Sequence, residues 1–312
     1  MRAQNVGIVW VWSWKGASVT VGVERRGSGP TVLLLPALSS ISTRAEMLPL
    51  QDRLASRFTT VAVDWPGFGD RPRPRLDWQP EMYRAFLTNL LANNVIDKPF
   101  ATVAAGHAAG YALAHAAANP GALGRLCLVA PTWRGPLPTM TGKRMPLFRR
   151  LSRLGDVPVL GFGLYRLNVN SPVLHMMARG HVYSDPGWLT PARLASKFAV
   201  IQAEGARHAS FRFVTGGLDP MQSRDEFLGA ASRIQDPVLV VYGAETPPKS
   251  KAEMEALAEL PNIEATTLPR GKLSAHEEFP EEVAGVLNPF LASPGPADGH
   301  RADADGDEAS TP

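Results

Sequence analysis

Short apolar runs that alternate with helical patterns constrain this chain more than any other feature. TVLLLP, FTTVAVD, FATVAAG, RLCLVAP and DPVLVVYG each have the length and composition of a buried strand. Segments with helical spacing lie between or after them, at residues 44–57, 80–95, 109–118, 249–260 and 280–291. The runs IVWVWSW and SVTVGVERR add two opening strands. This alternation predicts an α/β fold, with a mostly parallel sheet and helices on both faces.

One segment interrupts the alternation. The 312 residues are enough for one large domain with an insertion. Residues 133–215 are helical in pattern, apolar and basic, with 12 Lys and Arg against three Asp and Glu. We therefore expect an α/β core formed by residues 1–132 and 216–291, with residues 133–215 as a helical cap over one end of the sheet.

The two ends and the cysteine content bear on the expected environment. Residues 292–312 are acidic and nearly devoid of large apolar side chains, which predicts a disordered acidic tail. The single cysteine, Cys127, excludes an internal disulfide and lies in an apolar run typical of a buried, inert thiol. The apolar N-terminal stretch reads as a strand rather than a signal peptide, and no run is long enough to span a membrane. The expected location is cytoplasmic.

The motif at residues 106–110 is the most informative for chemistry. Gly106-His107-Ala108-Ala109-Gly110 would match G-x-S-x-G if Ala108 were serine. Four further stretches accompany it in order: LLLPALSS, VAVDWPGFGDRPRP, VLVVYGAETPP and LPRGKLSAHEEFPEE. Together they resemble the α/β-hydrolase fold with a helical cap over about residues 6–291. The stretches APTWRGPLPTM, GHVYSDP and KSKAEMEAL also resemble an uncharacterised plant and bacterial subgroup of that superfamily.

The resemblance assigns the three positions of a Ser-His-Asp triad to residues that lack the chemistry. The nucleophile position falls on Ala108, the acid on Thr246 and the base on Leu273. Possible substitutes nearby are Glu245, His276 and His107. The sequence therefore predicts a member of the superfamily that lacks the usual triad.

Backbone donors can outlast a lost triad. The resemblance places the two oxyanion-hole amides at Leu38 and Ala109, near the N-terminus of the helix that follows the motif. Each candidate side chain also has a purely structural reading, and for His107 we favour packing beneath the turn over catalysis. Candidates for the wall of a ligand pocket are Ala37, Trp65, His107, Trp133, Arg134, His181 and Tyr183.

Several classes of function are disfavoured by the sequence. It shows no metal-ligand spacing and no phosphate-binding loop, so no metal and no cofactor are expected. The basic residues of 133–215 alternate with Leu, Phe and Met instead of forming a polar stripe, which argues against nucleic acid as a partner. The sequence does not indicate an oligomeric state.

Three functions stay open at this point. The first is binding of a small amphipathic carbonyl or carboxylate ligand in a degenerate hydrolase site. The second is a non-canonical hydrolase or lyase that uses the backbone oxyanion hole. The third is a module that docks on a membrane surface or a partner protein through the basic cap, for which KRMPLFRRLSRLG is a suitable amphipathic segment. The third function predicts an exposed apolar face on the cap.

Overall fold

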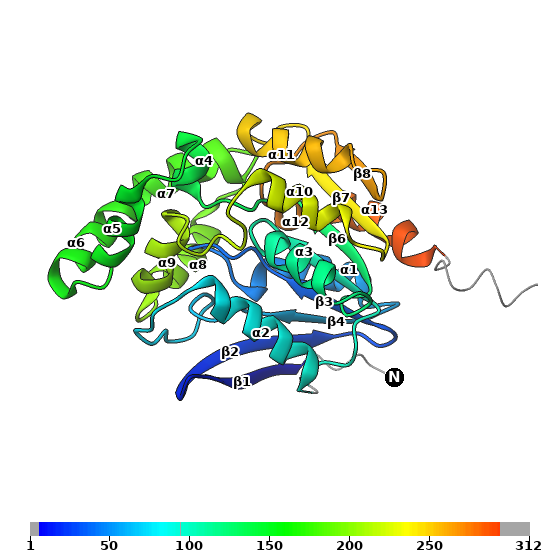
Figure 1. Ribbon diagram of the computed structural model, residues 1–312, viewed down its shortest axis with the longest axis horizontal. Coiled ribbons are helices and arrows are strands. Elements are labelled where there is room, and N and C mark those ends of the chain that lie inside the picture. Colours follow the sequence, from blue (N-terminus) through cyan, green and yellow to red (C-terminus); the bar gives the residue numbers. More distant parts are fainter. Residues whose placement is uncertain (1–5, 94, 294–312) are drawn as a thin grey trace, which may run out of the picture.

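A single eight-stranded sheet organises the computed structural model, which describes residues 6–93 and 95–293 (Figure 1). The strand order is β1-β2-β4-β3-β5-β6-β7-β8. β1 and β2 pair antiparallel, as do β2 and β4, and all other neighbours pair parallel. The strands are β1 (Val6–Trp14), β2 (Ala17–Arg26), β3 (Thr31–Leu35), β4 (Thr59–Val63), β5 (Ala101–Ala105), β6 (Arg125–Val129), β7 (Val238–Gly243) and β8 (Ile263–Leu268). The predicted mostly parallel sheet is confirmed.

The central strands are buried on both faces. Every residue of β3, β5, β6 and β7 is buried, which explains why these strands are continuous apolar runs rather than alternating patterns. Alternate residues of each strand contribute to two separate apolar cores, one on each face of the sheet. Helices are therefore required on both faces, as the sequence predicts.

Helices of the core cover the sheet from both sides. Side chains of α2, α3, α10 and α11 join one apolar core, and those of α1, α12 and α13 join the other. Their bounds are η1 (Arg44–Met47), α1 (Leu48–Leu54), α2 (Pro80–Ala92), α3 (Ala108–Ala118), α10 (Arg224–Ser232), α11 (Pro248–Ala258), α12 (Ala275–Glu278) and α13 (Pro280–Ala292). No helix was expected from the sequence at α10 or at the short α12.

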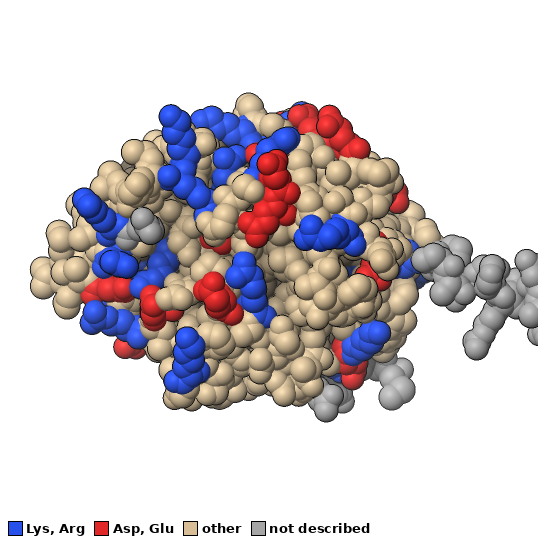
Figure 2. Space-filling model, in the orientation of Figure 1, with Lys and Arg blue, Asp and Glu red and all other residues tan. Residues whose placement is uncertain are grey.

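A helical insertion, α4 to α9, separates β6 from β7 and projects beyond one end of the sheet (Figure 1). It comprises α4 (Pro136–Thr141), α5 (Pro146–Leu154), α6 (Pro158–Asn168), α7 (Ser171–Met177), the π-helical turn η2 (Ala178–Val182), α8 (Pro191–Gln202) and α9 (Ala206–Val214). On the face shown in Figure 2, Lys and Arg side chains are distributed over this end of the molecule. The domain boundaries at 132 and 216 stay a prediction.

Acidic residues of α12 hold part of the insertion to the core. Glu277 accepts hydrogen bonds from the Tyr183 hydroxyl at 2.8 Å and from Lys197 Nζ at 2.9 Å. Glu278 accepts from the amides of Ser184 and Asp185. These contacts fix the segment after η2, and α8, against α12.

The described part of the chain ends one residue after α13. The predicted acidic tail, 292–312, lies outside the described residues from position 294 onward, and α13 extends to its first residue, Ala292. Within the described ranges, no helix combines the length and apolar character needed to cross a bilayer.

Candidate ligand-binding site

A cavity of about 650 Å³ lies where the parallel strands end. The segments that follow β3, β5, β6, β7 and β8 contribute to its wall, and helices of the insertion supply the remainder. In a parallel sheet these carboxyl ends share one edge, and ligands of open α/β folds bind where the connections run to opposite sides. β3 lies between β4 and β5, so the chain leaves β3 and β5 at such a point.

The turn between β5 and α3 reaches the cavity through Gly106. Gly106 follows the last residue of β5, has φ +51° and lines the cavity. Its carbonyl accepts the amides of Ala109 at 3.2 Å and Thr132 at 3.0 Å, which closes the turn. A Cβ atom at this position would lie 3.1 Å from the Cβ of Ala37. The tip of the turn therefore carries no side chain and lies directly against the loop after β3.

The structure places this tip two residues before the predicted Ala108. Ala108 is the first residue of α3, is fully buried, and is absent from the described residues that line the cavity. The motif allows two registers because alanine and glycine are both small: Ala104 to Ala108 fits the small-x-x-x-small spacing as well as Gly106 to Gly110 does. Only the backbone decides between them, since glycine adopts positive φ at little cost.

The candidate oxyanion amides change accordingly. The amide of Ala109 is already donated to Gly106, and Ala109 is buried away from the cavity. The amide at the equivalent place after the tip belongs to His107. Leu38 and His107 both line the cavity, and neither amide has an acceptor within the part of the chain that the structure describes. These two amides, at the N-terminus of α3 and in the loop after β3, are available to a carbonyl or carboxylate oxygen.

His107 is a buried, neutral histidine in the cavity wall. Its Nε2 lies 3.2 Å from the carbonyl oxygen of Leu218 and 3.6 Å from Oδ1 of Asp219. Burial lowers the pKa of His107 to about 4, against the opposing effect of the hydrogen bond to Leu218. Burial likewise raises the pKa of Asp219 to about 7, although Arg144 and the amide of Gly135 favour its charged form. His107 is therefore held by buried contacts, and it also forms part of the cavity wall.

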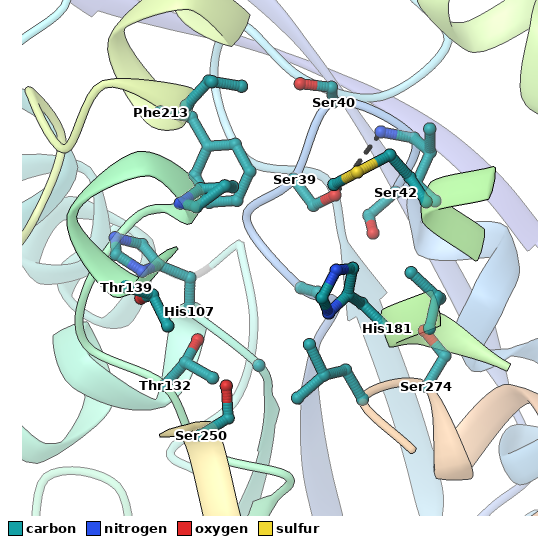
Figure 3. A pocket seen from close by; sticks show the side chains of 18 of the residues that line it. Ser39, Ser40, Ser42, His107, Thr132, Thr139, His181, Phe213, Ser250 and Ser274 are labelled. Atoms are coloured by element: carbon teal, nitrogen blue, oxygen red, sulfur yellow. Dashed lines mark hydrogen bonds between the residues drawn. The ribbon is translucent and has the colours of Figure 1, made fainter. Parts of the chain in front are cut away.

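His181 is the imidazole that projects into the cavity. Figure 3 shows its ring pointing from η2 toward the middle of the space, near the side chains of Ser39 and Ser42. Its side chain has no hydrogen-bond or ion-pair partner within residues 6–93 and 95–293. Its carbonyl accepts the amide of Leu273 at 3.4 Å, and the carbonyl of Val182 accepts that of Ser274 at 3.1 Å. The insertion thus supplies an imidazole next to the loop where the resemblance expects a catalytic histidine.

The other positions that the resemblance assigns to a triad have no acid and no base facing the cavity. Leu273 lines the cavity with an aliphatic side chain. Thr246 is buried and Glu245 is exposed, and neither belongs to the described residues of the cavity wall. The segment after β7 enters the wall one residue later, from Pro247 to Ser250.

His276 lies behind the cavity in a buried pair with Glu46. His276 Nε2 is 3.1 Å from Oε1 of Glu46, which also accepts the amide of Ala37 at 2.6 Å. Burial alone would raise the pKa of Glu46, but the hydrogen bond and charge of His276 hold that pKa below its ordinary value. The pair therefore fixes the loop that carries Leu38. Sequence reasoning missed Glu46, because no local pattern links it to a histidine 230 positions away.

Three predicted wall residues belong to the core instead. Trp65 is buried among aromatic rings and donates Nε1–H to the carbonyl of Pro36 at 2.9 Å. Trp133 stacks on Phe227, and Tyr183 stacks on Trp188 with ring centroids 4.0 Å apart. None of the three is among the described cavity residues. Large aromatic side chains bury most area within a core, which explains why they turn inward at these positions.

Ala37 and Arg134 do line the cavity as predicted. Arg134 forms an ion pair with Glu253 at 2.8 Å, and its guanidinium lies over the ring of Trp133. This pairing holds the cation at the edge of the site.

The cavity wall has a polar part and an apolar part. Hydroxyl groups come from both the core and α4, and they belong to Ser39, Ser40, Ser42, Thr132, Thr139, Ser250 and Ser274. The facing wall is formed by side chains between the end of α6 and the end of η2, which belong to Val169, Val173, Leu174, Met177 and Val182. In the described ranges, no group of three His, Cys, Asp or Glu side chains is arranged to hold a metal ion. The arrangement suits a ligand with one polar end and one apolar end.

Comparison with known proteins places the chain among hydrolase-like folds. A sequence model of the Alpha/beta hydrolase family matches residues 32–286. The chain is 24% identical over 295 residues to 2-(acetamidomethylene)succinate hydrolase of Mesorhizobium japonicum, covering 88% of this chain and 92% of that protein. The crystal structure of Cfl2 from Burkholderia cenocepacia superposes with TM-score 0.69 at 22% identity, covering 91% of this chain and 95% of Cfl2. A malate-bound esterase from Thermogutta terrifontis superposes with TM-score 0.67 at 18% identity, covering 93% and 98%.

Proposed function

Because the chain belongs to the alpha/beta hydrolase family, we propose that it binds a small amphipathic carbonyl or carboxylate compound without forming a covalent bond to it. The observation that carries this proposal is Gly106, which has no side chain at the tip of the turn after β5. Serine hydrolases of this fold need a hydroxyl at that tip. An acyl-enzyme therefore has no atom on which to form there.

The serines around the cavity do not replace the missing nucleophile. A serine attacks only when an adjacent base takes its proton. In the described ranges, neither His107 nor His181 is hydrogen-bonded to a serine or threonine hydroxyl. The site is thus a shaped pocket in which the chemistry of a covalent serine is not set up.

The polar end of the ligand would bind where the amides of Leu38 and His107 reach the cavity. Two amide donors and the positive end of the α3 dipole favour an anion or a carbonyl oxygen. His181 adds a side chain that can donate or accept a hydrogen bond at the same end. The names of the relatives support a carboxylate: one hydrolyses 2-(acetamidomethylene)succinate, and the esterase structure holds malate.

The apolar end would lie along the insertion. Val173, Leu174 and Met177 present branched and thioether side chains to the cavity. Burial of each methylene of an aliphatic chain contributes about 0.8 kcal/mol. Affinity should therefore increase with chain length until the 650 Å³ cavity is filled.

A second candidate is hydrolysis by water, which the position of His181 favours. His181 would take a proton from a water molecule as its oxygen attacks a carbonyl carbon held by the two amides. The same proton then passes to the leaving alkoxide, so that an acid and an alcohol are released. A positioned base contributes about 10²–10⁴-fold, so His181→Gln should abolish most turnover of p-nitrophenyl butyrate if this reaction occurs.

Calorimetric titration with octanoate, decanoate and dodecanoate tests the binding proposal. Two adjacent residues of α7 provide a matched pair of variants: Met177 lines the cavity, whereas Met176 is 64% exposed. Met177→Glu should abolish binding by placing a carboxylate in the apolar wall, and Met176→Glu should leave it unchanged. Equal affinities of both variants, or covalent labelling of the native protein by a fluorophosphonate, would refute the proposal.

A further inference from the structure

Exposed apolar side chains gather on one part of the helical insertion. Thirteen large hydrophobic residues are exposed in the described ranges, and nine of them lie between positions 140 and 176. We call the outer part of this set the apolar tip; it comprises Leu147, Val157, Val159, Leu160, Phe162 and Leu167. Val159 is 86% exposed and Leu167 is 69% exposed. Exposed apolar side chains gathered on α5, α6 and the turn between them indicate an interaction site.

The geometry of α6 presents the apolar tip outward. Val159, Phe162 and Arg166 follow one another at helical spacing, as do Leu160 and Leu167, while Tyr165 and Gly161 are buried beneath them. Tyr165 donates its hydroxyl to the carbonyl of Ile201. α6 is therefore held to the protein by one face, while its opposite face exposes aliphatic and aromatic groups at the end of the molecule opposite to α13 (Figure 1).

Basic side chains surround the apolar tip. Lys143, Arg150, Arg153 and Arg166 are exposed, and none has an ion-pair partner in the described ranges. The sequence between positions 136 and 182 contains a single acidic residue, Asp156. Its carboxylate is already shared by His208 and Arg212. Figure 2 shows an uncharged surface at this end of the molecule, with several Lys and Arg side chains and a smaller number of acidic ones beside it.

We propose that the apolar tip docks on the surface of an anionic lipid bilayer. Apolar side chains that enter the boundary between headgroups and acyl chains, with cations that meet anionic headgroups, are the two components of interfacial binding. A second copy of this chain fits less well, because residues 133–215 carry nine net positive charges and two such surfaces would repel. α5 and α6 have only 9 and 11 residues, so they would lie in the interface rather than cross it.

The proposal is independent of what the cavity binds, although the two surfaces adjoin. Val169 directly follows α6, Val173 lies in α7, and both line the cavity. Docking through α6 would therefore bring the apolar wall of the cavity close to the bilayer. The docking itself needs only the tip and its cations.

Co-sedimentation with vesicles tests the docking. The full chain should bind phosphatidylcholine vesicles that contain phosphatidylglycerol, bind pure phosphatidylcholine weakly, and dissociate as salt increases. Arg150→Glu with Arg153→Glu should lower the partition coefficient about twentyfold or more, since each cation contributes roughly fivefold. Val159→Asp with Phe162→Asp should reduce binding to the level of the neutral vesicles.

Matched controls lie elsewhere on the molecule. Val9→Asp with Val11→Asp changes two exposed apolar residues of β1, at 49% and 60% exposure, and should not alter binding. Lys98→Glu, at the opposite end of β5 from the cavity, should likewise have little effect. Loss of binding in these controls as large as in the tip variants would overturn the proposal. Light scattering that shows a dimer broken by Val159→Asp, without vesicle binding, would overturn it in favour of a second copy.

Discussion

Replacement of Gly106 by serine tests the placement of the tip of the turn. A residue with a Cβ atom at φ +51° has a backbone strain of about 1–2 kcal/mol. Loss of glycine also lowers the entropy of the unfolded chain, which offsets about 0.4–1 kcal/mol. The new Cβ would lie 3.1 Å from that of Ala37, and crowding of this kind typically adds about 1 kcal/mol or more. The Gly106→Ser variant should therefore be about 2 kcal/mol less stable than the native protein.

Two further variants separate strain from crowding. Gly16→Ser introduces the same side chain at φ +83° with no other atom within 4 Å, so it measures strain alone. Ala37→Gly removes the contacted atom, so in that background Gly106→Ser should cost only what Gly16→Ser costs. Urea unfolding followed by circular dichroism gives each free energy of unfolding, and the double-mutant cycle should yield an interaction of about 1 kcal/mol. An identical cost of Gly106→Ser with and without Ala37→Gly would refute the assigned geometry.

Further predictions concern buried groups. Because the pKa of His107 falls from 6.5 to about 4 on folding, the unfolded chain binds the extra proton, and stability decreases as pH falls through that window. Between pH 6.5 and about 4, the free energy of unfolding of the native protein should fall by about 3 kcal/mol more than that of His107→Gln. Urea unfolding that shows the same loss for both proteins would contradict this. Glu46→Leu should cost about 1–3 kcal/mol because it removes the acceptor of two buried groups, the imidazole of His276 and the amide of Ala37, and an unchanged free energy of unfolding would contradict the pairing with His276. Burial raises the pKa of Cys127, so a thiol reagent should react with it only after unfolding; rapid reaction of the native protein would exclude a buried thiol.

The hydrophobic pattern was sufficient to predict the core. A strand that is covered on both faces consists of a continuous apolar run. TVLLLP and VLVVYG therefore implied a parallel sheet between helical layers. The starts of three helices were predicted to within one residue, since the helical patterns at 80–95, 249–260 and 280–291 correspond to α2, α11 and α13. The short α12 was missed because four residues are too few to show a period.

The candidate site was only partly predictable. Ala37, Leu38, Arg134 and His181 lie in the cavity wall as the sequence suggested. Trp65 was expected in the cavity wall but packs in the core against Tyr83, because the sequence does not show toward which side of a loop an aromatic ring turns.

By itself, the order of residues determined that a glycine- and alanine-rich turn without serine follows a central strand, and that a basic, apolar insertion accompanies it. The tertiary structure alone decided that Gly106, rather than Ala108, forms the tip, because the register of a turn depends on where strand pairing ends and on which residue adopts positive φ. It also brought Glu46 and His276 together across 230 positions. Packing of distant segments fixes such contacts, and no local sequence pattern records them.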